Sequence, residues 1–114
     1  MFPKHQRIRL NKEYEHVFTK GRGYHSHYVT LKTVRNDLAM NRFGIIVSNK
    51  TEKKAYRRNR IRLQVREILR TSQIHFQKNG FDLVFVIKKP LIELKEYAKI
   101  QVQIHFLLKK ARFL

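Results

Sequence analysis

Cysteine is absent from this chain of 114 residues. A disulfide framework and a thiolate zinc site are therefore both excluded. Because nothing in the sequence requires an oxidising compartment, we expect a cytoplasmic protein.

Long apolar runs are also missing. No segment approaches the ~18 to 20 apolar residues that a membrane-spanning helix needs. The basic first ten residues are followed by polar ones, where a signal peptide would carry its apolar region. We therefore expect neither secretion nor membrane insertion, and the length suits a single domain.

Acidic residues are scarce. Asp and Glu number 8 against 26 Lys and Arg, which gives a formal net charge of +18. Such an excess repels itself in a compact fold, so we expect a polyanionic partner, with nucleic acid the first candidate and an anionic membrane the second. Hydrophobic residues still make up 42% of the chain and aromatic residues 11%, which argues against a disordered basic tail.

The scarcity of carboxylates also argues against a catalyst that acts alone. Metal-dependent hydrolysis of a phosphodiester needs clustered carboxylates, and the only aspartates are Asp37, in an expected turn, and Asp82, at an expected strand start. His25 and His27 would share one face of a strand, with no third ligand in view. We expect no catalytic or metal-binding side chain, and interpret both histidines as surface or RNA-contacting residues.

The sequence pattern predicts six elements of secondary structure. Asn11 can cap the first helix, and Gly21 and Gly23 can end it. Because the first two strands are closely joined, we expect them to pair antiparallel. The predicted order begins with a helix at 12–20 and strands at 24–34 and 43–48. After a loop at 49–54 comes a long basic helix, which ends at Asn79-Gly80, and then a strand at 81–87, which ends at Lys88-Lys89-Pro90. The last helix carries Tyr97, Ile100, Ile104, Leu107 and Ala111, with Glu93 and Glu96 near its start. This order indicates the α+β class, with helices packed on a sheet.

The most basic stretch runs from residue 53 to residue 70 and is amphipathic. Guanidinium groups bind phosphate through two parallel hydrogen bonds and stack on bases, and Asn59 adds a donor and an acceptor. From charge alone, two interpretations stay open, a solvated basic face or a surface that binds RNA. The apolar side of the helix is Ile61, Val65, Ile68 and Leu69, and the polar side includes Asn59, Arg62, Arg66 and Arg70.

The same stretch resembles the RNR signature of the bacterial ribonuclease P protein subunit. The signature reads Lys54-Ala55-Tyr56-Arg57-Arg58-Asn59-Arg60-Ile61-Arg62 and follows the expected strand at 43–48. The segment from Arg9 to Gly21 resembles the opening helix of the family, and the segment from Gly80 to Val86 resembles a later strand. With Lys88-Lys89-Pro90 and the closing helix, the resemblance covers nearly the whole chain.

The resemblance implies a fold and a function. The fold is a single RNA-binding domain, residues 1–114, with an unusual left-handed βαβ crossover. The function is that of a subunit of ribonuclease P, an endoribonuclease ribonucleoprotein whose RNA subunit, with Mg²⁺, removes the 5′ leader from precursor tRNA. The implied partners are the catalytic RNA and precursor tRNA, with neither DNA nor a membrane expected.

The resemblance also assigns residues to two sites. Aromatic faces stack on unpaired bases with little sequence preference. For Tyr14 and Phe18, which are spaced i, i+4 on the first helix, ordinary core packing is the alternative interpretation. The implied RNA-subunit site is Arg58, Asn59, Arg60, Arg62 and Arg66, supported by Lys50, Lys53, Lys54 and Arg57. The implied leader cleft, between the first helix and the sheet, is lined by Tyr14, Phe18, Tyr28 and Leu31.

Three positions depart from the family pattern. Leu63 stands where the family usually has a basic residue, so one phosphate contact is missing or replaced. The loop Thr51-Glu52-Lys53-Lys54 lacks the usual glycine and is one residue longer. Leu31 stands where an aromatic residue is often found, and it can pack against a base but stacks less well.

Two other classes of protein would share this charge and size. A structural RNA-binding protein, such as a ribosomal component, would need no cleft for single-stranded RNA. A membrane-active protein would not need internal apolar strands. A ribonuclease P subunit would bind precursor tRNA more tightly than mature tRNA only when the RNA subunit is present, which distinguishes it from a structural RNA-binding protein. Absence of vesicle binding at physiological salt would exclude a membrane-active protein.

Overall fold

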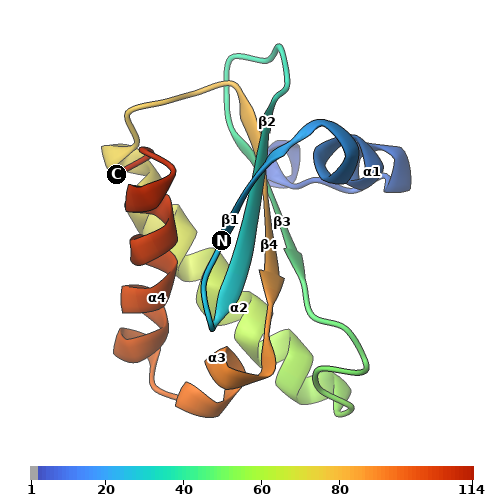
Figure 1. The fold of residues 1–114 in the computed structure, drawn as a ribbon, viewed down its shortest axis with the longest axis vertical. Helices are drawn as coiled ribbons and strands as arrows, with labels where there is room; N and C mark the ends of the chain where they lie inside the picture. The colour runs from blue at the N-terminus through green and yellow to red at the C-terminus, as the bar shows by residue number, and fades with distance from the viewer. Residues whose placement is uncertain (1–2) are drawn as a thin grey trace.

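The structure, a computed structural model, describes residues 3–114 and contains one four-stranded sheet with helices on both faces (Figure 1). The strands run in the order β1-β2-β4-β3. The elements are η1 (Lys4–Gln6), α1 (Asn11–Lys20), β1 (Arg22–His25), β2 (Val29–Arg35), β3 (Arg42–Ile46), α2 (Ala55–Ser72), η2 (Gln73–His75), β4 (Phe81–Ile87), α3 (Lys89–Leu94) and α4 (Tyr97–Lys110).

The strand predicted at 24–34 is in fact a hairpin of β1 and β2. Ser26 makes the turn, because its hydroxyl accepts hydrogen bonds from the backbone N–H groups of Tyr28 and Val29, both at 3.2 Å. His25 therefore ends β1 while His27 lies in the turn. The prediction that the two histidines share one face of a single strand is wrong.

The predicted antiparallel pairing of the strands at 24–34 and 43–48 is also wrong, because β4 lies between β2 and β3. β4 pairs antiparallel with β2 and parallel with β3. Its residues Leu83, Val84 and Phe85 are all fully buried. A strand that is apolar on both faces is stable only at the centre of a sheet with both sides covered, so β4 displaces the nearer pairing of β2 with β3.

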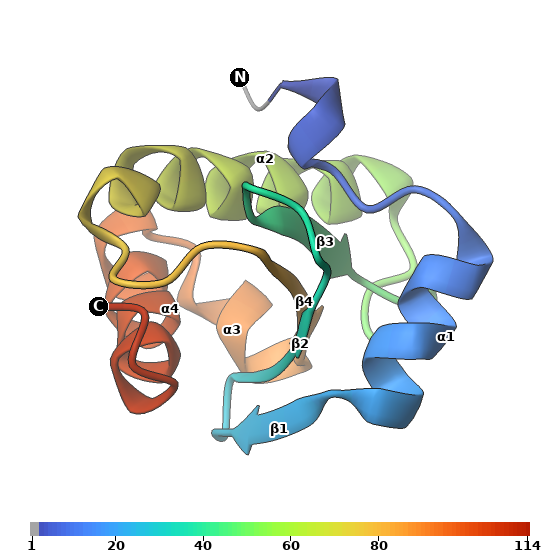
Figure 2. The ribbon, with the colours of Figure 1, turned by 90° about the horizontal axis from the view of Figure 1, so that it is seen from above.

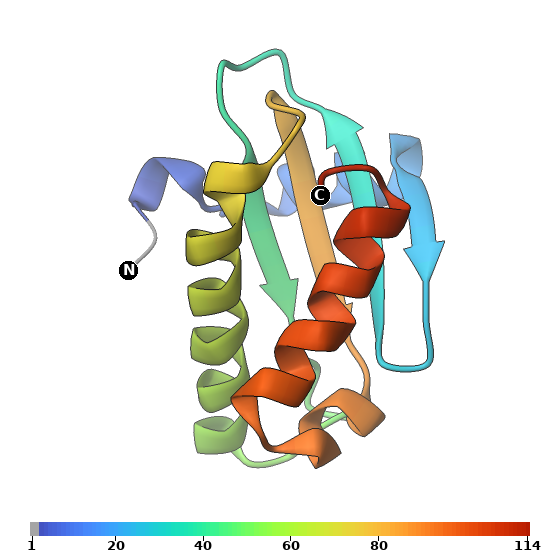
Figure 3. The ribbon, with the colours of Figure 1, turned by 90° about the vertical axis from the view of Figure 1, so that its left-hand side faces the viewer.

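The unit β3–α2–β4 is a left-handed crossover. In Figure 3, α2 lies in front of the sheet, β3 and β4 both point downward, and β4 lies to the right of β3. A right-handed connection, found in about 98% of such units, would place β4 on the other side of β3. The handedness implied by the resemblance is confirmed.

The two faces of the sheet bury different partners. Figure 2 shows α1 on one side of the sheet and α3 and α4 on the other, with α2 along the β3 edge. Leu31 and Phe85 are fully buried in the larger core, together with residues of α2 and α4 such as Ile68 and Ile104. The α1 side is a smaller cluster built on Val17 and Val84, with Tyr14, Val34, Ile46 and Val86 packed around it.

Helices α1 and α2 form where the sequence predicted them, but the predicted cap of α1 and the predicted end of α2 are wrong. α1 ends at Gly21 as predicted, but its N-cap is Leu10, and the Glu13 carboxylate accepts the N–H groups of Arg9 and Leu10 in place of an Asn11 cap. α2 ends at Ser72, well before Asn79. The predicted apolar side of α2 is confirmed as buried, comprising Ile61, Val65, Ile68 and Leu69.

The last predicted helix is divided in two. Lys95 has a φ of 63°, a left-handed conformation that ends α3. Glu93 therefore belongs to α3, and Glu96 is the N-cap of α4. Within the described residues, no helix combines the length and the apolar character needed to cross a membrane.

Candidate nucleic-acid interface

Helix α2 presents two basic flanks that point to different neighbours. Its apolar side is fixed on the sheet, so successive polar residues are divided between a flank that faces α1 and a flank that faces α3. Asn59, Arg62 and Arg66 belong to the first flank, and Arg57 and Arg60 to the second. The sequence predicted a single polar face, because a helical period alone does not show what stands on either side of it.

The α1 flank gathers three guanidinium groups around Tyr14. Arg66 shares a small pocket of about 170 Å³ with Arg7 and Tyr14. Burial, and then the positive charges of Arg7 and Arg62, lower the pKa of Arg66 below its ordinary value. Because these cations repel one another, an anion such as a phosphate would be bound favourably there.

Two residues predicted for RNA binding also hold the protein itself together. Arg58 donates hydrogen bonds to the backbone carbonyls of Glu52 and Lys53, at 2.8 and 2.9 Å, and so closes the loop onto the start of α2. Arg62 donates to the Asn59 side-chain oxygen at 2.9 Å and to the Val47 carbonyl at 3.4 Å. These bonds fix the direction in which the α1 flank points.

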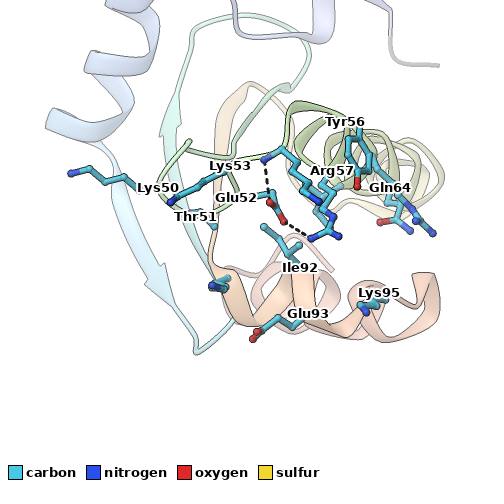
Figure 4. Close-up of a pocket in the computed structure, with 14 residues that line it drawn as sticks. Lys50, Thr51, Glu52, Lys53, Tyr56, Arg57, Gln64, Ile92, Glu93 and Lys95 are labelled. Atoms are coloured by element: carbon cyan, nitrogen blue, oxygen red, sulfur yellow. Dashed lines mark hydrogen bonds and ion pairs between the residues drawn. The ribbon is translucent and has the colours of Figure 1, made fainter.

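The α3 flank borders a groove of about 730 Å³ (Figure 4). The predicted loop residues lie here, away from the Tyr14 pocket. The groove brings together five of the predicted RNA-binding residues, namely Lys50, Lys53, Lys54, Arg57 and Arg60.

The two aromatic residues of α1 differ in exposure. Tyr14 is half-buried, its hydroxyl donates to the Ile8 carbonyl at 3.3 Å, and burial raises the pKa of its phenol. Gly44 leaves room for the ring, since a Cβ there would lie 2.7 Å from it. Phe18 is 40% exposed, with the Lys32 ammonium 6.0 Å from the centre of its ring. Phe18 is therefore the residue of α1 whose ring is free to stack on a base.

The two strand residues predicted for the cleft do not line it. Leu31 is fully buried in the larger core, on the face of the sheet opposite α1. Tyr28 lies in the β1–β2 turn and packs against the same core. On the α1 side the sheet presents instead Thr30, Lys32 and Val86, all partly exposed. The alternation of residues along β2 could have predicted that Leu31 is buried, because Val29 and Thr33 lie on the same buried face of the strand.

Sequence reasoning also missed the ion-pair network that attaches α1 to the sheet. The Arg42 guanidinium donates two hydrogen bonds to Asp82 on β4, at 2.8 and 2.7 Å, and one to Glu13 on α1, at 2.6 Å. Asn36 donates a third hydrogen bond to Asp82, at 2.9 Å. The carboxylates of Asp82 and Glu13 raise the pKa of Arg42. The pKa of Glu13 is lowered, first by the hydrogen bond from the Leu10 N–H and then by other donors that include Arg42. Nothing local in the sequence signals partners so far apart in the chain.

The protein side chains do not form a metal centre within residues 3–114. No group of three His, Asp or Glu residues there could hold a metal ion. Glu13 and Asp82, which Arg42 brings together, are both ion-paired with its guanidinium.

Known proteins share both the sequence and the fold. A family model described as Ribonuclease P matches residues 2–112. The Ribonuclease P protein component of Clostridium botulinum (strain Loch Maree) is 35% identical over 108 residues, which cover 95% of this chain and 96% of the relative. That of Syntrophomonas wolfei is 41% identical over 88 residues, 77% of this chain and 72% of the relative. The solved RNase P protein from Thermotoga maritima is 30% identical, with a TM-score of 0.82 over 91% of this chain and 96% of that one. The α+β fold class is confirmed.

Proposed function

The chain belongs to the ribonuclease P protein family and is a subunit of that endoribonuclease ribonucleoprotein, and from this premise we propose how its two surfaces divide the work. The basic surface of α2 and the preceding loop binds the catalytic RNA subunit. The α1 side of the sheet holds the 5′ leader of precursor tRNA. The RNA-subunit surface comprises Lys50, Lys53, Lys54, Arg57, Arg58, Asn59, Arg60, Arg62 and Arg66.

The observation that carries this proposal is the shared pocket of Arg66 and Tyr14. It makes the α1 flank of α2 continuous with the aromatic side of α1, so the catalytic RNA on one surface and the leader on the other can meet there. Phe18 supplies a stacking face, and Lys32 places a positive charge beside it for a phosphate. Tyr14 shapes the wall between the two surfaces, and Leu31 and Tyr28 have no direct part.

The protein contributes charge and position, and we propose that the RNA subunit holds the Mg²⁺. Mg²⁺ requires oxygen ligands in near-octahedral geometry, and the Asp82 carboxylate already accepts three hydrogen bonds, from Arg42 and Asn36. The excess of cations instead screens the repulsion between two polyanionic RNAs. With an RNA partner of this kind, we propose a cytoplasmic location.

Reconstitution tests this division. The purified protein is combined with the RNA subunit of the same organism, and 5′ leader removal from a precursor tRNA is followed at low Mg²⁺, with the RNA subunit alone as control. Faster cleavage with the protein is expected, because it adds leader contacts and screens charge. RNA binding without any stimulation would contradict the proposal.

Phe18→Ala is expected to weaken the binding of precursor tRNA to the reconstituted enzyme by about 5- to 150-fold, since stacking on one base contributes about 1 to 3 kcal/mol. The fold should tolerate the change, because the ring is already 40% exposed. Phe106→Ala is a matched control, since Phe106 is 52% exposed on α4, on the other side of the sheet. Binding is measured for precursor and for mature tRNA, and an equal loss for both would show that Phe18 does not contact the leader.

A further inference from the structure

The groove between α2 and α3 has a composition unlike that of a simple charged surface. In Figure 4, Tyr56, Arg57 and Gln64 lie on α2 on one side of the groove, while Ile92 and Glu93 on α3, and Lys95 directly after it, lie on the other. The loop before α2 closes one end. This volume of about 730 Å³ falls in the range of pockets that enclose small organic ligands.

The charge of this groove selects an anion. Seven of its lining residues are Lys or Arg, against the two carboxylates of Glu52 and Glu93. Glu52 is already occupied, because it accepts the backbone N–H of Lys54 at 3.2 Å and lies 3.7 Å from the Arg57 guanidinium. Most of the positive charge therefore has no acidic partner inside the groove, which favours a ligand with several phosphates.

The apolar part of the groove fits a base. Tyr56 is 64% exposed, although burying a ring of this size is strongly favourable. The Arg57 guanidinium lies 5.8 Å from the centre of the Tyr56 ring, which orients both groups. Ile61 and Ile92 supply apolar surface on the two walls. An exposed aromatic ring set among cations is the arrangement that binds unpaired nucleotides by stacking and charge together.

We propose that this groove is a subsite for an unpaired RNA nucleotide, with the base stacked on Tyr56 and its flanking phosphates held by Arg57, Arg60 and Lys89. The inference rests on the proposed function and adds α3 to the RNA-binding surface. Arg62 and Arg66, on the opposite flank of α2, remain available for a second RNA segment. The protein thus holds two strands at once, one on each flank of α2.

Cross-linking locates the RNA directly, because the chain has no native cysteine. A photo-crosslinker is attached to Glu93→Cys in the groove and, as a control, to Val102→Cys, which lies on α4 and is 62% exposed. Each protein is assembled with the RNA subunit alone and then with precursor tRNA added. Cross-links from position 93 to unpaired nucleotides, and none from position 102, are expected. The two assemblies distinguish the RNA subunit from the leader as the source of the nucleotide, and no cross-link from position 93 in either assembly would overturn the proposal.

Binding measurements separate this subsite from the wider function. Tyr56→Leu is expected to weaken RNA-subunit binding between about 5- and 150-fold, whereas Tyr56→Phe keeps the ring and the affinity. Lys89→Ala should reduce the slope of log affinity against log salt by about 0.7. If the unaltered protein binds the RNA subunit while Tyr56→Leu changes the affinity for the RNA subunit, and that of the assembled enzyme for precursor tRNA, less than twofold, the subsite is refuted and the proposed function stands. If the unaltered protein does not bind the RNA subunit, both fail together.

Discussion

Arg42→Met is expected to lower the free energy of unfolding by about 3 kcal/mol, the largest stability loss that we predict for a partly exposed side chain. Asp82 is only 3% exposed in its side chain, and Arg42 neutralises it with two hydrogen bonds. Removing one partner of a buried pair leaves the other charge without compensation, which costs roughly 3 to 5 kcal/mol. We expect the lower end because Arg42 itself is 20% exposed.

Urea unfolding measures this loss, and two variants make it specific. The double variant Arg42→Met with Asp82→Leu should recover much of the stability, since an apolar pair leaves no buried charge. Arg70→Met is the matched control, because its pair with Glu67 is exposed on α2 and such pairs contribute about 0 to 1 kcal/mol. A change of less than 1 kcal/mol for Arg42→Met would contradict the proposed importance of this network.

The same network links acid stability to the position of α1. The pKa of Glu13 lies below the ordinary value of 4.5, so the folded protein binds fewer protons there than the unfolded chain. Its stabilising contribution is therefore fully present above about pH 4.5 and is lost as the pH falls through the lowered pKa. Glu13→Gln should remove this part of the pH dependence while it leaves the Arg42 to Asp82 bonds in place.

Replacing Arg60, Arg62 and Arg66 together by Ala is expected to reduce the salt dependence of RNA-subunit binding most strongly. Each phosphate contact contributes about 0.7 to 0.9 to the slope of log affinity against log salt, so three contacts should lower the slope by about 2 to 3. Affinity at physiological salt should fall in parallel. The measurement is a binding isotherm with the RNA subunit at several salt concentrations, with circular dichroism to confirm that the helix persists.

A control variant separates local contacts from the general field of the protein. Lys99, Lys109 and Lys110 are exposed on α4, and replacing them by Ala removes the same charge away from the proposed interface. Its slope should stay close to that of the unaltered protein. If both triple variants lose the same affinity and the same slope, the binding is nonspecific and the assignment of α2 is wrong.

The periodicity of the sequence alone determined most of the helices and one strand. The apolar side of α2 is buried as predicted, and β4 has the predicted bounds of 81–87. These features were predictable because they depend on local spacing: a 3.6-residue period for the helix and a continuous apolar run for the strand. The basic surface followed from the charge of the sequence, and its RNA partner from the resemblance to the RNR signature.

Only the tertiary structure decided which residues meet. The insertion of β4 between β2 and β3 placed Leu31 in the core and left Lys32 beside Phe18. Arg42 joins Glu13 to Asp82 across separations of 29 and 40 residues in sequence, and α3 completes the groove at Tyr56. Strand order and such contacts depend on competition between whole surfaces for burial, because β4 gains more by taking the centre of the sheet than β2 and β3 gain by pairing. That comparison involves segments far apart in the chain, and no local pattern contains it.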